Sequence, residues 1–101
     1  MQLDIDEIYT FKLNSGEELV AKVKDIYDDH SVMISDPVSI GPTPNGGVGL
    51  VPSLFTYDAA KLVRLNTNNC GLFAHTDENI RAKYIEMTTG IQVGSKKVLL
   101  G

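Results

Sequence analysis

The sequence has little of what several classes of protein require. It contains one cysteine, Cys70, which excludes an internal disulfide and a cysteine-based zinc site. Its apolar runs are only a few residues long, too short to cross a bilayer. The start, MQLDIDEIY, is acidic and lacks the basic region and apolar stretch of a secretory signal. We therefore expect a cytoplasmic protein.

Basic residues are also in the minority. Nine lysines and arginines stand against 13 acidic residues, for a net charge of −4. Nucleic-acid-binding proteins usually carry a basic surplus, because phosphate contacts dominate their affinity. The average field of this chain repels polyanions, so a nucleic-acid site would need a local cluster of bases. The candidates for such a cluster are Lys22, Lys24, Lys61, Arg64, Arg81, Lys83, Lys96 and Lys97.

Length and composition are those of one globular domain. The chain has 101 residues, 43% of them hydrophobic and 22% charged. That size supports a single modest core. We assign the domain to residues 1–93 and expect residues 94–101 to form a flexible tail.

Alternating apolar residues predict a mainly β chain. The expected strands cover residues 7–13, 17–27, 32–40, 48–56, 61–65 and 70–75. About five short antiparallel strands in so small a chain normally curl into a barrel. Ala21 is the small residue where the long second strand would bend most tightly, and Pro37 marks an irregular position in the third.

The end of the chain changes to a helical period. Thr76 is a good N-cap and Gly90 a natural stop, so we expect one helix over residues 77–89. Residues 91–93 are a candidate edge strand. We expect the apolar face of the helix to dock on the open end of the barrel, and that face comprises Ile80, Tyr84 and Met87.

An open barrel leaves strand edges without partners. Neither the first strand nor the strand at residues 70–75 carries enough charge to repel another chain. If the free edge of one copy pairs with the free edge of the next, the contact is head-to-tail and closes into a ring. The candidate interface residues are Phe11, Leu13, Gly71, Leu72 and Phe73.

The stretch FKLNSGEELVAKVKDI, residues 11–26, is more specific. It combines an apolar strand, a turn ending in Gly16, and a strand with a small residue, Ala21, five positions later. A polar turn at residues 28–31 and the apolar residues 32–34 follow. This pattern resembles the first motif of the Sm/LSm/Hfq family, and the chain looks most like the divergent small Sm-like proteins carried by marine phages.

The resemblance implies a strongly bent, five-stranded, SH3-like barrel that assembles into homomeric rings of about five to seven copies. It also implies RNA binding and a role as a post-transcriptional regulator, in the host cytoplasm if a phage encodes the chain. Three features depart from the family. The helix is expected at the C-terminus rather than the N-terminus. Ser31 stands where the family has an asparagine, and residues 66–69 replace an arginine-glycine pair.

Two turns supply the candidate RNA-binding residues. In the first, Asp29, His30 and Ser31 would line the pore of a ring, with His30 stacking on a base and Ser31 bonding its edge. In the second, the amides of Asn66, Asn68 and Asn69 offer donors and acceptors to bases. Both stretches are equally typical of solvated turns, which favour these residue types for backbone reasons.

Two functions follow from these observations. The resemblance favours an RNA-binding ring, whereas the acidic balance favours a homo-oligomeric structural or protein-interaction ring without a nucleic-acid site. No catalytic constellation, metal-ligand set or cofactor motif is recognisable, so we expect neither an enzyme nor a cofactor. The loop GPTPNGGVG lacks the lysine and the serine or threonine of a phosphate-binding loop, and Cys70 adjoins no base that would activate it.

Overall fold

The computed structural model describes residues 2–27 and 29–90. The strands are β1 (Ile8–Leu13), β2 (Glu18–Tyr27), β3 (Ser31–Pro42), β4 (Val48–Pro52), β5 (Val63–Asn66) and β6 (Cys70–His75). A 3₁₀ turn, η1 (Thr67–Asn69), links β5 to β6, and the helix α1 (Glu78–Ile85) runs into a π-helical turn, η2 (Glu86–Gly90). Asp28, the candidate strand at 91–93 and the tail at 94–101 lie outside the described residues.

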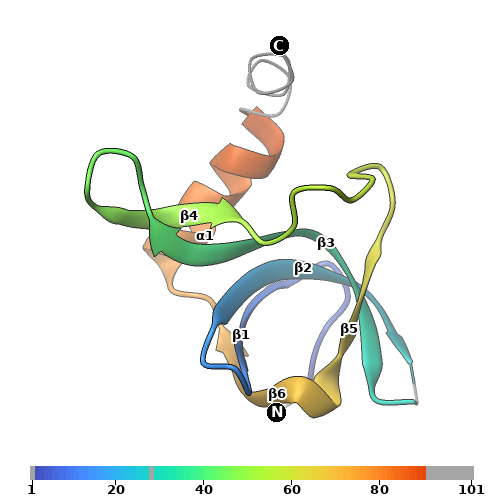
Figure 1. The fold of residues 1–101 in the computed structure, drawn as a ribbon. Coiled ribbons are helices and arrows are strands. Elements are labelled where there is room, and N and C mark those ends of the chain that lie inside the picture. Colours follow the sequence, from blue (N-terminus) through green and yellow to red (C-terminus); the bar gives the residue numbers. More distant parts are fainter. Residues whose placement is uncertain (1, 28, 91–101) are drawn as a thin grey trace.

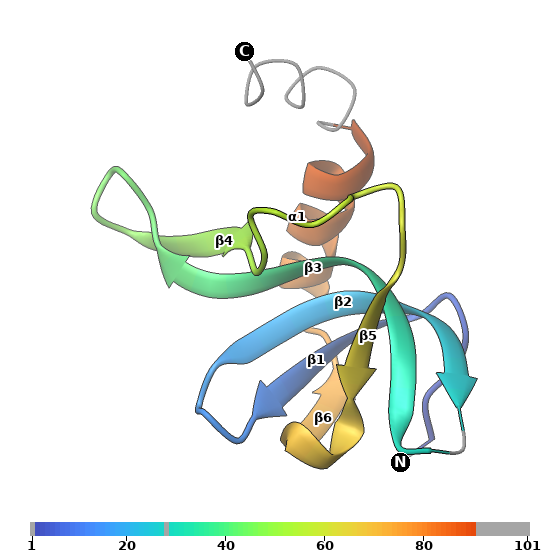
Figure 2. The same cartoon turned by 45° about the vertical axis from the view of Figure 1, so that its right-hand side comes forward.

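The strands form one antiparallel sheet that curls on itself (Figures 1 and 2). Their order is β4-β3-β2-β1-β6, and β5 pairs with the first part of β3. The prediction of a mainly β, antiparallel fold with a C-terminal helix is therefore confirmed. Each of the six predicted strand ranges corresponds to one observed strand, one more than the five strands of the expected barrel. The strand predicted at 48–56 ends at Pro52, and the chain rejoins β3 at Val63. Within the described residues no pairing joins β5 to β6, so the sheet stays open there.

The bend of the sheet lies where small and irregular residues predict it. The register of β2 against β3 shifts between Val20 and Lys22, and the intervening Ala21 is fully buried. A larger side chain would not fit at such a bulge, which increases the local twist. Asp36, with φ of 50°, and Pro37 lie where β3 leaves its partner β5 and meets β4. The long strand β3 thereby pairs with β5 through its first part and with β4 through its second part.

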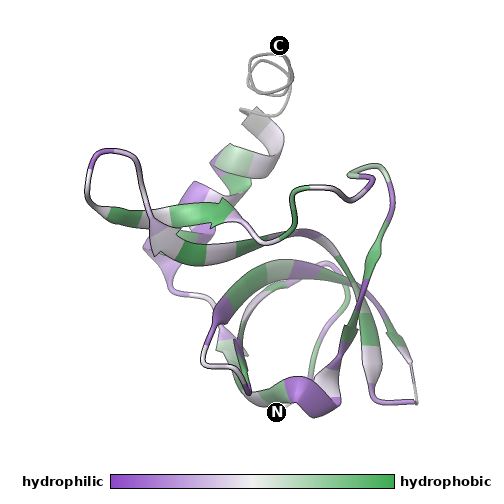
Figure 3. Ribbon diagram, viewed as in Figure 1, coloured by the Kyte–Doolittle hydropathy of each residue, from purple (hydrophilic) through white to green (hydrophobic). Residues whose placement is uncertain are grey.

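The two faces of the sheet bury two separate cores. Successive residues of a strand point to opposite faces, so β1 sends Tyr9 and Phe11 inward and Ile8 outward. The inner core is completed by Leu19, Ala21, Val23, Val32 and Ile34. The outer core joins Ile8, Val20 and Val38 to Tyr84 of α1. Figure 3 shows apolar residues along the central strands and within α1. The expectation that the helix docks on an open barrel end is wrong, because α1 covers the outer face of the sheet.

The helix starts and ends differently from its sequence-based prediction. Asp77 is the N-cap, and its Oδ2 accepts hydrogen bonds from the nitrogens of Asn79 (3.0 Å) and Ile80 (3.3 Å). The predicted cap, Thr76, is buried and its hydroxyl bonds that of Thr10 at 3.0 Å. In the last turn, the hydroxyl of Thr88 donates to the carbonyl of Tyr84 at 2.8 Å. Thr88 belongs to η2, and such side-chain bonds compete with regular helical pairing. Of the helices in the described part, none is long and apolar enough to span a membrane.

Candidate nucleic-acid interface

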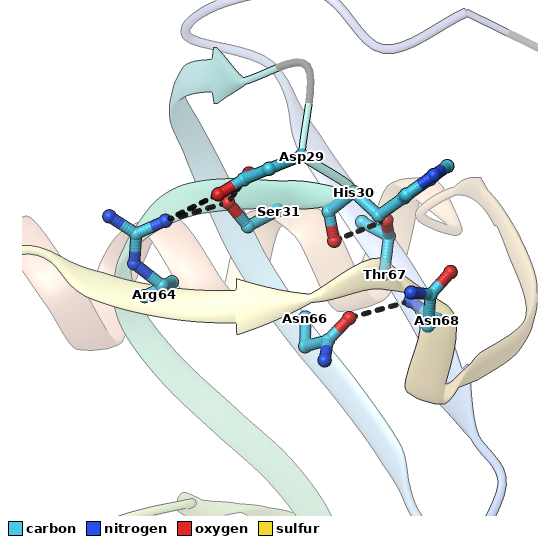
Figure 4. A network of polar contacts seen from close by, with 7 residues as sticks. All are labelled: Asp29, His30, Ser31, Arg64, Asn66, Thr67 and Asn68. Carbon is cyan, nitrogen blue, oxygen red and sulfur yellow. Dashed lines mark hydrogen bonds and ion pairs between the residues drawn. The ribbon is translucent and has the colours of Figure 1, made fainter.

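The two predicted turns meet at one end of the sheet. Ser31 faces Asn66 in the pairing of β3 with β5. Thr67 then donates two hydrogen bonds to the carbonyl oxygen of His30, one from its backbone nitrogen and one from its hydroxyl, both at 2.8 Å. Figure 4 shows these residues in one polar network. Residues 29–31 and 66–69, far apart in sequence, therefore form a single surface.

Arg64 of β5 contacts two residues of the first turn. Its Nη1 lies 2.8 Å from the hydroxyl oxygen of Ser31 and 3.5 Å from Oδ2 of Asp29 (Figure 4). The Ser31 hydroxyl in turn donates to Oδ1 of Asp29. Ser31 is buried, so its hydroxyl holds Arg64 and Asp29 in place instead of presenting itself to a ligand.

Arg64 also lies against an aromatic ring. Its guanidinium carbon is 5.1 Å from the centroid of the Tyr27 ring, a cation–π geometry. Tyr27 is 39% exposed, and the Arg64 side chain is 57% exposed. The pair therefore offers flat surfaces to solvent, of the kind on which nucleobases stack.

The role of Arg64 was missed from the sequence, although one signal pointed to it. Residues two apart in a strand share a face. Arg64 therefore points to the same side of β5 as Asn66, a predicted site residue, while Val63 and Leu65 pack against the inner core. Thr67 was missed for a different reason, since only the pairing of β5 with β3 brings it beside the first turn. Tyr27 adjoins that turn in sequence, but only the folded chain places Arg64 over its ring.

The charges of this surface largely offset each other. The hydrogen bond from Ser31 is the main cause that lowers the pKa of Asp29. Burial opposes it, and the nearby Arg64 charge lowers the pKa further by a smaller amount. Asp29 is thus ionised at neutral pH and faces the guanidinium of Arg64. The surface therefore carries little net positive charge, and it presents aromatic and guanidinium planes and hydrogen-bonding groups to solvent.

Of the remaining predicted residues, His30 is exposed to solvent, whereas the asparagines stabilise the turn in which they lie. His30 has a left-handed backbone, with φ of 63°, and its imidazole extends away from the polar network (Figure 4). Asn66 caps η1, because its side-chain oxygen accepts from the nitrogen of Asn68 at 2.9 Å. The carbonyls of Asn68 and Asn69 accept from Asn14, at 3.3 and 2.7 Å. The asparagines therefore build the turn, whereas the exposed His30 directs its imidazole away from the network.

A cleft of about 300 Å³ adjoins the surface, at the lower end of volumes typical of small-ligand sites. Its walls combine the polar edge of both turns with apolar residues. The lining residues are Gln2, Leu3, Ile26, Tyr27, His30, Ser31, Val32, Thr67 and Phe73. Over residues 2–27 and 29–90, no three His, Cys, Asp or Glu side chains gather as a metal ion would require.

The predicted interface residues fall in two different places. β1 is flanked by β2 on one side and β6 on the other, so it has no free edge. Phe11 is fully buried, and Leu13 packs partly buried against the inner core. Gly71, Leu72 and Phe73 lie on β6, which ends the strand order, and Leu72 is 71% exposed. Only the β6 part of the predicted interface is therefore at a sheet edge.

Comparison with known proteins gives no family. No protein-family model matches the chain, and no curated protein matches it.

Proposed function

We propose that the chain is a small Sm-like protein that forms rings and binds single-stranded RNA. The proposed binding surface comprises residues 29–31, Arg64 with Tyr27, and η1. One observation carries the proposal: Thr67 of the second turn bonds the carbonyl of His30, which joins the two turns into one surface, and Arg64 of β5 bonds Ser31 and Asp29 beside them. The curled sheet and the pattern around Gly16 support the Sm-like barrel.

Stacking explains how an acidic chain would hold RNA. Bases stack on aromatic and guanidinium planes with about 1–3 kcal/mol each, without needing a basic field. Tyr27, Arg64 and His30 present such planes at one end of the sheet. Arg64 adds one cation that a phosphate can share with Asp29. Recognition of single strands in this way fits a post-transcriptional regulator, encoded by a phage as the resemblance implies.

The proposed ring depends on the strands at the ends of the sheet, which in the described part of the chain have an edge free to pair with another copy. β6 stands at one end, and β4 and β5 pair only with β3 among the described strands. Backbone groups on such edges favour pairing with another chain. A contact between the two different edges is head-to-tail, and its rotation sets the number of copies, about five to seven in this proposal.

A titration of U-rich and A-rich single-stranded RNA against the assembled protein tests the proposal. Affinity should fall with salt by roughly 0.7 in log K per unit of log salt for each phosphate that an Arg64 contacts, because stacking supplies the remainder. Arg64→Ala should weaken binding roughly tenfold, equivalent to about 1.4 kcal/mol. Arg81→Ala on α1 removes the same charge from another element and should leave binding nearly unchanged. An intact ring that binds neither RNA at low salt would overturn RNA binding.

A second function, a homo-oligomeric structural or protein-interaction ring, is favoured by the ion pair between Asp29 and Arg64. That pair offsets the cation nearest the two turns. The same titration separates the functions, since a purely structural ring shows no salt-dependent RNA affinity and no effect of Arg64→Ala.

A further inference from the structure

The segment between β4 and β5 exposes an unusual amount of apolar surface. Phe55 is 84% exposed, and Leu54 and Leu62 in the same segment are 42% and 44% exposed. We call residues 53–62 the Phe55 loop. A large aromatic ring left in water beside further apolar groups is typical of an interaction site.

The Phe55 loop is held at both ends. At its start, the nitrogen of Ser53 donates to the carbonyl of Pro37 at 3.1 Å, and its hydroxyl lies 2.7 Å from that of Ser39. Near its end, Asp58 accepts from the nitrogens of Ala60 and Lys61, both at 3.0 Å, which closes a local turn, and the next residue after the loop, Val63, pairs with Ile34 of β3. A loop fixed in this way loses little conformational entropy when its exposed residues are bound.

A shallow, mainly apolar hollow of about 300 Å³ lies at the β6 end of the sheet, whereas the Phe55 loop connects β4 to β5. It is lined by Thr10, Lys12, Glu18, Leu72, Phe73 and Ala74, and we call it the β6 hollow. Thr10 pairs with Ala74 and Lys12 with Leu72, so these side chains share the outer face of β1 and β6. None of the lining residues comes from the Phe55 loop.

We propose that Phe55 and Leu54 of one copy insert into the β6 hollow of the next copy. This inference rests on the proposed ring and names the side chains that fix its head-to-tail contact. An apolar projection and a matching hollow elsewhere on the same molecule make a heterologous contact. The Phe55 loop leads into β5, and the β6 hollow lies on β6. These are the strands whose edges the proposed ring would pair.

Charge is compatible with this occupant. Lys12 and Glu18 at the β6 hollow lie 3.8 Å apart and compensate each other. The Phe55 loop likewise carries one anion, Asp58, and one cation, Lys61. Neither surface repels the other, and exposed apolar groups on both lose contact with water when they meet.

Two variants, each damaging one side of the contact, provide the test. Phe55→Glu places a charge on the apolar loop and leaves the β6 hollow unchanged. Leu72→Glu places a charge in the β6 hollow and leaves the loop unchanged. Sedimentation velocity should show each variant alone as a smaller species than the wild-type assembly, with an association constant lowered at least tenfold. Their equimolar mixture should form a one-to-one complex through the single undamaged contact.

Controls separate this inference from the proposed ring. Ile5→Glu changes another exposed apolar residue, 48% exposed and outside the strands and both proposed surfaces, and should assemble as the wild type does. Phe55→Ala, which adds no charge, should weaken assembly in the same direction. A wild-type ring that persists in both Phe55 variants, or a mixture that forms no complex, overturns the inference and leaves the ring standing. A monomeric wild-type protein overturns the ring itself.

Discussion

The phenol oxygen of Tyr84 accepts a hydrogen bond from the backbone nitrogen of Lys22 at 3.1 Å. The same hydroxyl donates to the carbonyl of Ser35 at 2.8 Å. Lys22 and Ser35 face each other across β2 and β3, beside the register shift at Ala21. A side chain of α1 thus bridges two strands where their ladder is interrupted, which fixes the helix on the outer face of the sheet.

Tyr84→Phe should lower the free energy of unfolding by roughly 1–3 kcal/mol, because two backbone groups lose their partner while the ring still fills its place. Urea denaturation monitored by circular dichroism measures the difference. Tyr27→Phe is the matched control, since Tyr27 is 39% exposed, and its effect should stay within about 0.5 kcal/mol. Equal losses in both variants would contradict the bridging role of Tyr84.

The same hydroxyl predicts a pH dependence. Burial is the main cause that raises the pKa of Tyr84 above its ordinary value. The unfolded chain therefore releases this proton at lower pH than the folded one. The contribution of Tyr84 to stability is complete below about pH 10 and is lost as the pH rises through the raised folded pKa. Unfolding curves between pH 8 and 11 should show a steeper fall for the wild type than for Tyr84→Phe, and parallel falls would contradict this.

Asp29→Asn should strengthen RNA binding by up to about fivefold, since loss of the exposed ion pair leaves Arg64 available to phosphate. The asparagine oxygen can still accept from Ser31, so the turn should persist. Fluorescence anisotropy with labelled RNA measures the change. Glu78→Gln removes one negative charge from α1 and controls for net charge. If both variants bind alike, the pairing of Asp29 with Arg64 does not limit binding.

Gly16→Ala should destabilise the protein by about 1–2 kcal/mol, because its φ of 95° is unfavourable for any residue with a Cβ. Space is not the reason, since an added Cβ would meet nothing within 4 Å. Gly47→Ala is the control, because the nearest atom would lie at an ordinary 3.6 Å and the residue has no positive φ. Thermal unfolding of the two variants should differ by several degrees, and coincident midpoints would contradict the argument.

Cys70 should react slowly with thiol reagents. Burial raises the pKa of its thiol, so less thiolate is present near pH 8 than in an unfolded chain. Ellman's reagent should therefore modify the folded protein more slowly than the same protein in urea, and the rate should rise with pH. Equal rates in the two conditions would show that the thiol is not shielded.

Sequence patterns predicted those features that depend on neighbouring residues. β6 has the predicted bounds, 70–75, and Ala21 lies at the bend because only a small residue fits there. The helix cap shows the limit of such reasoning. Thr76 and Asp77 are both residue types that commonly cap helix N-termini. Asp77 is the N-cap of α1, because Thr76 is buried and bonded to Thr10.

Alternation and turn residues alone determined that this chain is an antiparallel β protein with a helix at its end, since strand and helix periods are local properties. Only the tertiary structure decided that β3 pairs with both β4 and β5, that α1 covers the outer face, and that Thr67 and Arg64 reach the first turn. Most of these relationships depend on contacts between residues far apart in sequence, such as Arg64 with Ser31, 33 positions away. No local pattern specifies such contacts, because many pairings satisfy the same alternation until packing and hydrogen bonding select one.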